Sequence, residues 1–165
     1  FQKNNGKKLP LPPILHANLE DMLQLQEEEG ISSNSSNKKN ILIVGDVHGC
    51  YQELLTLVET AKSKIYYHDD DDNNDDGKID FTCVILVGDL CNKGPESLQV
   101  IQHVRKTPNW FAVRGNHDEG ALCAMLGDNV QLEKHTYQWV LNNNNNNDII
   151  TDKDVEWLAN LPYTI

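Results

Sequence analysis

The chain has 165 residues, of which 39% are apolar, and carries a formal net charge of −11. This length suffices for one domain with a buried core. The acidic balance, without a basic stripe, argues against a groove for duplex nucleic acid, and no apolar run is long enough to span a bilayer.

The four cysteines show no CxxC spacing, so we expect reduced thiols in an intracellular, cytoplasmic protein. No signal-peptide pattern is present, although the chain starts at Phe1 rather than Met, which leaves a targeting segment further upstream open. Composition leaves the oligomeric state undetermined.

Residues 1–39 form a predicted peripheral and linker segment that is partly disordered. The run Pro10-Leu11-Pro12-Pro13 favours extended backbone. Residues 18–29 show apolar spacing that predicts a short helix, and the Ser- and Asn-rich residues 32–40 are typical of a linker.

The predicted core occupies residues 40–165. Continuous apolar residues at 41–45 predict a strand buried on both faces. A helix from about Tyr51 to Lys64 follows, because apolar residues recur on one face at Leu54, Val58, Ala61 and Ile65. Residues 68–78 then contain no apolar side chain and predict a solvated acidic loop insert.

This acidic insert resembles a calcium-binding loop only in part. Asp72, Asn74 and Asp76 alternate as calcium ligands do, but the twelfth position counted from Asp72 is Cys83 rather than an acid. We therefore favour a disordered insert over an EF-hand loop.

Two further strand–helix units follow the insert. Residues 81–87 and 110–113 predict strands, and a helix between them starts at Pro95-Glu96-Ser97 and continues to about Lys106. Another helix is expected after Asp118. The order β-α-β-α-β-α implies an α/β fold with a parallel sheet and right-handed crossovers.

The pattern weakens after Gly127. Residues 132–141 predict a helix, and 142–147 are an asparagine tract that we interpret as a loop insertion. A capping box at Thr151–Asp154 predicts a short helix that continues to Asn160. Residues 161–165 look like the beginning of another strand, which indicates a fragment.

Metal-binding side chains follow each of the three predicted strands. Asp46 and His48 come after the first, Asp89 after the second, and Asn116 and His117 after the third. Neighbouring parallel strands bring these groups to one edge, where clustered carboxylates repel each other unless cations lie between them. Two divalent ions about 3.5–4 Å apart would account for the cluster. Such ions can also supply the positive charge with which an acidic protein binds phosphate esters.

Each motif also has a purely structural interpretation when taken alone. Gly88-Asp89 is a common turn, and Asn116-His117-Asp118 could cap the next helix. The occurrence of all three motifs in order, at the ends of successive strands, favours the metal site. The other histidines, at positions 16, 68, 103 and 135, are interpreted as ordinary surface residues.

The motifs Gly45–Gly49 (GDVHG), Gly88–Gly94 (GDLCNKG) and Gly115–Asp118 (GNHD) resemble those of the calcineurin-like metallophosphoesterase superfamily. The resemblance spans residues 40–165. Its details are similar to the ApaH-like phosphatase branch, which is related to symmetrical diadenosine tetraphosphatase and to serine/threonine phosphoprotein phosphatases.

The resemblance implies the N-terminal part of a four-layer α-β-β-α sandwich that binds two divalent ions, usually Mn, Fe, Zn or Co. It assigns Asp46 and His48 to the first ion. Asp89 would bridge the two ions, Asn116 would bind the second, and His117 would be the general acid.

Several positions depart from the family's pattern. Phosphoprotein phosphatases have an Asp-Arg pair where this chain has Asn92-Lys93, and an amide cannot pair with His117 as a carboxylate would. Lys93 and Arg114 are the candidate phosphate-binding residues, with Lys93 acting as a point charge. Asp118 replaces the glutamate usual in phosphoprotein phosphatases. These changes favour the ApaH-like branch.

The family also takes three metal-binding histidines from its second half, and no segment of this chain matches them. We therefore expect a truncated metallophosphoesterase that hydrolyses a nucleoside polyphosphate, an RNA 5′ end or a phosphoprotein. One alternative is a non-catalytic pseudoenzyme that binds phosphate or a partner through half a metal site. A serine/threonine protein phosphatase is the alternative within the same class.

Overall fold

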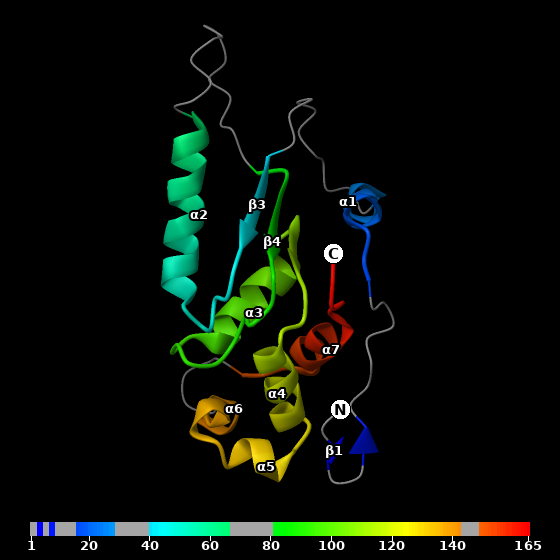
Figure 1. Ribbon diagram of the computed structural model, residues 1–165, viewed down its shortest axis with the longest axis vertical. Coiled ribbons are helices and arrows are strands. Elements are labelled where there is room, and N and C mark those ends of the chain that lie inside the picture. The colour runs from blue at the N-terminus through cyan, green and yellow to red at the C-terminus, as the bar shows by residue number, and fades with distance from the viewer. Residues whose placement is uncertain (1–2, 5–6, 9–15, 29–39, 67–80, 143–148) are drawn as a thin grey trace, which may run out of the picture.

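The computed structural model describes residues 3–4, 7–8, 16–28, 40–66, 81–142 and 149–165 (Figure 1). The acidic insert 68–78 and most of the asparagine tract 142–147 lie outside these ranges, as does His68. The elements in chain order are β1 (Lys3–Asn4), β2 (Lys7–Lys8), α1 (Leu19–Glu28), β3 (Ile41–Val44), α2 (Tyr51–Tyr66), β4 (Cys83–Leu86), α3 (Ser97–Lys106), β5 (Trp110–Ala112), α4 (Asn116–Met125), α5 (Asn129–Leu132), the 3₁₀ helix η1 (His135–Tyr137), α6 (Trp139–Asn142) and α7 (Asp152–Asn160).

The centre of the fold is a parallel sheet of three strands in the order β3-β4-β5. Val44 pairs with Leu86, and Leu86 pairs with Ala112, so the three strands end at the same level. The predicted α/β class and the β-α-β-α-β-α order are confirmed. This register places the three motif loops side by side.

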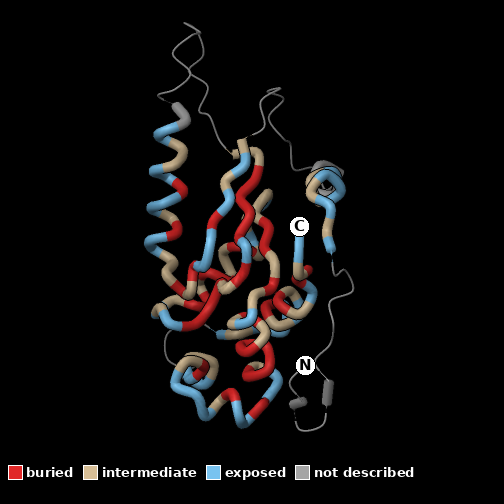
Figure 2. The backbone as a smooth tube through the Cα atoms, viewed as in Figure 1, coloured by how far each residue is buried: buried red, intermediate tan, exposed pale blue. Residues whose placement is uncertain are grey.

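Helices cover the two faces of the sheet unequally. The main core packs β-strand residues such as Leu86 against Leu54 of α2, Ile101 of α3 and Leu122 of α4. A smaller cluster on the other face joins Ile85 and its neighbours to α1; its members are Cys83, Ile85, Phe111, Leu19, Met22 and Leu23. Figure 2 shows the buried residues concentrated around the strands and α4.

The strand β3 differs from the prediction of burial on both faces. Ile41 and Ile43 are 43% and 66% exposed, whereas Val44 is buried. An edge strand with only one covered face gives this alternation. By contrast, every residue of β4 is buried, because this central strand has the main core on one face and the α1 cluster on the other.

The boundary of α4 was also predicted wrongly. The helix begins at Asn116 rather than after Asp118, because the Asp118 side chain accepts a hydrogen bond from the backbone N–H of Gly115 at 2.9 Å and so caps the helix start. Asn116 and His117 therefore belong to the first turn of the helix.

The C-terminal third is more broken than predicted. The expected helix 132–141 is replaced by α5, η1 and α6, and Asp128 caps the first of these through the backbone N–H of Val130. The predicted capping box of α7 at Thr151 is confirmed. The expected strand 161–165 is reduced to one isolated parallel bridge between His16 and Thr164.

None of the helices within the described ranges is long and apolar enough to cross a membrane.

Candidate metal centre

Backbone hydrogen bonds join the loops that follow β3 and β4. The N–H groups of Val47 and His48 both donate to the carbonyl oxygen of Asp89, at 3.2 and 2.8 Å. The next N–H, that of Gly49, donates to the carbonyl oxygen of Leu90 at 2.8 Å. The first two motifs are thus held in a fixed relation to each other by the backbone alone.

Several non-glycine residues of these loops have left-handed backbone conformations. The φ angles are +48° at His48, +51° at Asp89, +73° at Asn92 and +64° at Lys93. Such conformations are costly for residues with a Cβ and cluster at functional sites. Here they turn the side chains of two loops toward a common point.

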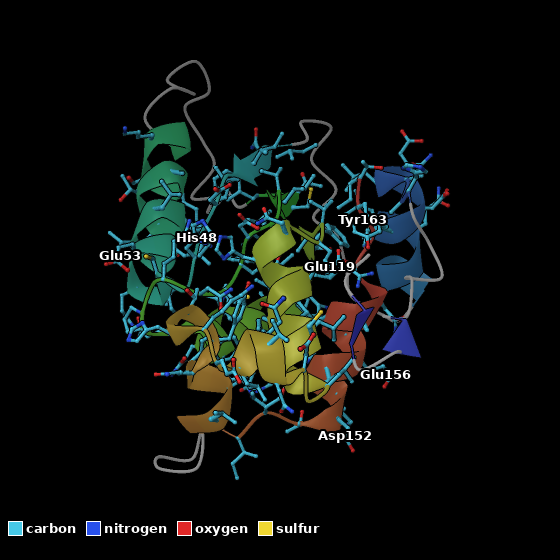
Figure 3. All side chains as sticks on the ribbon, turned by 60° about the horizontal axis from the view of Figure 1, so that its bottom comes forward. His48, Glu53, Glu119, Asp152, Glu156 and Tyr163 are labelled. Atoms are coloured by element: carbon cyan, nitrogen blue, oxygen red, sulfur yellow. The ribbon has the colours of Figure 1, made fainter. Side chains whose placement is uncertain are left out.

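The donor atoms of three motif residues lie close together. His48, Asp89 and His117 each offer one ligand atom, and these atoms lie within 4.8 Å of one another. His48 Nε2 is 3.5 Å from Asp46 Oδ2 and 3.7 Å from Asp89 Oδ2. Figure 3 shows His48 among the side chains of this region. Imidazole nitrogens and carboxylate oxygens suit Zn, Mn or Fe, so the donor set fits a divalent ion.

The tautomer of His48 is fixed by a neighbouring carbonyl group. His48 Nδ1 lies 3.2 Å from the carbonyl oxygen of Cys91, which can only accept, so Nδ1 carries the proton. Nε2 is then the bare nitrogen, and it accepts a hydrogen bond from Lys93 Nζ at 2.7 Å. An ion bound at this nitrogen must displace the Lys93 ammonium group.

Asp89 is supported from the third motif. Its Oδ1 accepts a hydrogen bond from the backbone N–H of His117 at 3.0 Å, while Oδ2 faces His48. Gly115 passes so close that a Cβ there would collide with the Asp89 carboxylate and backbone nitrogen. Only glycine at position 115 therefore lets the loop after β5 come this close to the loop after β4.

Asp118 is a buried anchor whose contacts with the loop after β4 were not predicted from the sequence. Its Oδ1 accepts hydrogen bonds from the N–H groups of Leu90 and Cys91, at 2.8 and 3.3 Å, and from Cys91 Sγ at 3.2 Å. Its Oδ2 accepts from Gly115. Burial raises the pKa of Asp118, although these hydrogen bonds act in the opposite direction. The sequence held one clue to this role: Asp118 lies three residues after Gly115, the N-cap of α4, where an acid can accept a hydrogen bond from the N-cap backbone.

Asn92 pairs with His117 through its amide group. Asn92 Nδ2 lies 3.2 Å from both His117 Nδ1 and the His117 carbonyl oxygen. The indole Nε1 of Trp139 donates to Asn92 Oδ1 at 2.6 Å. Trp139 lies in α6, outside the three motifs, so nothing in the motif spacing pointed to it.

A comparison with known proteins identifies the family of the chain. Residues 39–165 match the family described as "Calcineurin-like phosphoesterase". The chain belongs to this family.

Several bacterial proteins are similar to the chain. The chain is 37% identical over 94 residues to an asymmetrical bis(5′-nucleosyl)-tetraphosphatase PrpE of Halalkalibacterium halodurans, a match that covers 55% of the chain. It is 33% identical over 130 residues, or 75% of the chain, to a symmetrical bis(5′-nucleosyl)-tetraphosphatase of Coxiella burnetii. Both matches cover 36% of the relative, so the chain spans about a third of the length of these proteins.

A serine/threonine-protein phosphatase 1 of Salmonella typhimurium is 29% identical over 109 residues, covering 66% of the chain and 40% of that protein. Among solved structures, a metallophosphoesterase from Sphaerobacter thermophilus has 21% identity and a TM-score of 0.45, over 76% of this chain and 42% of that one.

Two of the seven candidate residues, Asn116 and Arg114, form no side-chain hydrogen bond or ion pair with the other five. Asn116 is exposed in the first turn of α4, and its side chain makes no hydrogen bond to any described residue. Arg114 is only 4% exposed, and its guanidinium lies 4.9 Å from the centre of the Tyr163 ring. Within the described residues its side-chain nitrogens have no hydrogen-bond acceptor. Figure 3 shows Tyr163 beside Glu119, to which its hydroxyl donates at 3.3 Å.

His103 differs from the prediction of an ordinary surface histidine. It is partly buried, with its ring 5.4 Å from that of Tyr51 and 4.7 Å from that of Trp110. Burial lowers the pKa of His103. It lies on α3 (Ser97–Lys106) at the edge of the main core, where Tyr51 and Trp110 pack against that core.

Proposed function

We propose that this chain is the N-terminal portion of a metal-dependent phosphoesterase with a dinuclear centre. The observation that carries the proposal is the convergence of side-chain nitrogen and oxygen atoms of His48, Asp89 and His117 within 4.8 Å, at the aligned ends of three parallel strands. In this proposal residues 1–39 are peripheral, and residues 40–165 belong to the four-layer phosphoesterase domain.

The arrangement supports a division of roles among the motif residues. Asp46 and His48 would hold one ion, and Asp89 would bridge it to a second ion that Asn116 binds. The ions would be Mn, Fe, Zn or Co. When bound, such ions polarise a phosphoryl oxygen and lower the pKa of a water molecule. Asp89 suits the bridging role because it lies between the first and third motifs.

Two further side chains would act on the substrate. His117 would donate a proton to the leaving oxygen, since it lies beside the carboxylate of the bridging residue. Lys93 is exposed, and its ammonium group already reaches His48, so it can contact a phosphate bound at the centre. We do not extend this role to Arg114, because its guanidinium is buried against Tyr163.

Nucleoside polyphosphates are the substrate class we favour. The two tetraphosphatases share 37% and 33% identity with the chain, compared with 29% for the serine/threonine-protein phosphatase. RNA 5′ ends and phosphoproteins are the alternative substrates. A cytoplasmic location belongs to the same proposal, supported by four free thiols rather than disulfides.

The test compares the kcat of Asp89→Asn with that of the wild type in the intact protein. Both are supplied with manganese, and each is assayed with a dinucleoside tetraphosphate, capped RNA and a phosphopeptide. We expect a loss in kcat of about 100-fold or more, because ion placement contributes several kcal/mol to catalysis. An amide oxygen can still accept the His117 N–H, so the fold should persist. Asp152→Asn, an exposed acid on α7, is the control.

The outcomes separate the candidate functions. Metal-dependent hydrolysis that survives Asp89→Asn would refute the bridging role. Metal binding without hydrolysis of any of the three substrates would favour the non-catalytic alternative. That alternative is supported by the Lys93 ammonium group on a ligand nitrogen of His48.

A further inference from the structure

Two contacts fix the orientation of the Asn92 side chain. Asn92 is completely buried, and one end of its amide lies 2.6 Å from the indole Nε1 of Trp139. An indole N–H can only donate, so the atom that faces it must be the amide oxygen. The other end lies 3.2 Å from the carbonyl oxygen of His117, which can only accept, so that end must be the NH₂ group.

This orientation determines the hydrogen-bonding role of the His117 ring. Asn92 Nδ2 lies 3.2 Å from His117 Nδ1 and has one hydrogen for this atom and one for the carbonyl oxygen. An amide nitrogen cannot accept, so Nδ1 must be the acceptor. A neutral imidazole that accepts at Nδ1 carries its proton on Nε2.

We propose that Trp139, acting through Asn92, is a positioning residue that holds neutral His117 as the Nε2–H tautomer. His117 Nε2 makes no hydrogen bond to any residue of the described ranges, so its proton is available to another acceptor. The use of that proton on a leaving oxygen rests on the proposed function. The tautomer itself is a property of the hydrogen-bond chain and does not depend on hydrolysis.

A carboxylate at position 92 would impose the opposite tautomer. It can only accept, so it would require a proton on His117 Nδ1. It would also face the carbonyl oxygen of His117 without a hydrogen to share. The burial of Asn92 and the carbonyl oxygen of His117, which needs a donor, therefore favour an amide over a carboxylate at this position.

The direct test is ¹⁵N NMR of the histidine side chains in the intact, metal-free protein, at a pH at which the rings are neutral. A His117→Asn variant assigns the His117 signals by their loss. We expect Nδ1 to have the chemical shift of an unprotonated ring nitrogen and Nε2 that of a protonated one. A protonated Nδ1 in the wild type would overturn the proposal.

Variants test the two linking residues. Trp139→Phe keeps an aromatic ring but removes the N–H, so a measurable population of the Nδ1–H tautomer should appear. Asn92→Asp should shift His117 to that tautomer. Trp157→Phe, on α7 and partly buried like Trp139, is the matched control and should change nothing. If His117 keeps the Nε2–H tautomer in Trp139→Phe, Trp139 has no positioning role. If it keeps that tautomer in Asn92→Asp, the group at position 92 does not determine the tautomer.

Kinetics provide the second readout. We expect Trp139→Phe to lower kcat about tenfold with little change in KM, since a general acid contributes about 100-fold or more and only its tautomer is disturbed. A tenfold rise in KM at constant kcat would overturn the positioning role. An intact protein without hydrolytic activity would contradict the proposed function alone, because the NMR measurement is made without metal or substrate.

Discussion

Asp118 shows how a single side chain can determine the geometry of a site that it does not enter. It joins the loop after β4 to the loop after β5 by hydrogen bonds from Leu90, Cys91 and Gly115. Sequence reasoning recognised Asp118 only as a substitute for glutamate or as a helix cap. Its contacts with Leu90 and Cys91 join residues nearly 30 positions apart and leave no local pattern.

We expect Asp118→Asn to lower the free energy of unfolding by about 1–3 kcal/mol, the cost of one unsatisfied buried donor. Asparagine has one acceptor oxygen, so its NH₂ group must face either the Gly115 N–H or those of Leu90 and Cys91. Urea denaturation measures the effect. Asp21→Asn, on the exposed side of α1, is the control, and an equal loss in both variants would contradict this role.

At the scale of elements, apolar runs were enough to predict the three strands and the helices between them. The mispredicted features depend on side-chain contacts and strand positions that the spacing of apolar residues does not record. The start of α4 depends on the Asp118 cap, and the exposure of β3 depends on its place at the sheet edge. The short pieces α5, η1 and α6 have too few residues to show a helical period.

The packing of the loop after β4 against the loop after β3 can be tested with two glycines, Gly94 in the former and Gly45 in the latter. A Cβ on Gly94 would lie 2.5 Å from the carbonyl oxygen of His48 and 2.7 Å from the carbonyl carbon of Gly49, whereas a Cβ on Gly45 meets nothing within 4 Å. Gly94→Ala should therefore cost about 1–3 kcal/mol of stability, as overpacking does. Gly45→Ala should change it by no more than about 0.5 kcal/mol. Thermal unfolding that ranks them in reverse would refute this description of the loop.

For the whole molecule, the sequence predicted one parallel sheet but not what covers its two faces. The apolar residues of α1 gave a helical pattern without indicating their partners. In the structure Leu19, Met22 and Leu23 pack on the sheet face opposite the main core. The ion pair between α3 and α7 was also not predicted. In the sequence Arg105 is an ordinary cation on a helix and Asp154 is a capping acid, but in the fold Arg105 Nε lies 2.9 Å from Asp154 Oδ1.

This link predicts a pH dependence of global stability. Burial by itself would raise the pKa of Asp154, but hydrogen bonds from Thr151 and Arg105 outweigh it and lower that pKa. Between the folded and unfolded pKa values the unfolded chain binds more protons. The contribution of Asp154 is therefore complete above about pH 4, near the unfolded pKa, and is lost as the pH falls through the folded pKa.

Asp154→Asn should remove this contribution. The difference in free energy of unfolding between wild type and Asp154→Asn should be largest near neutral pH and should shrink as urea titrations are repeated toward pH 3. Glu156→Gln, an exposed change on the same helix, should show a small difference throughout. A difference for Asp154→Asn that grew on acidification would contradict the sign of the shift.

The left-handed backbone at His48, Asp89, Asn92 and Lys93 has a consequence for how such a protein can change over time. Glycine adopts this conformation without a Cβ penalty, so at each position it would relieve about 1 kcal/mol of strain. It would also delete the side chain whose direction the strain secures. At buried Asn92 the loss of the hydrogen bonds to Trp139 and His117 would cancel this gain. At exposed Lys93 nothing cancels it, so a screen for thermal resistance alone would favour glycine at this proposed phosphate contact.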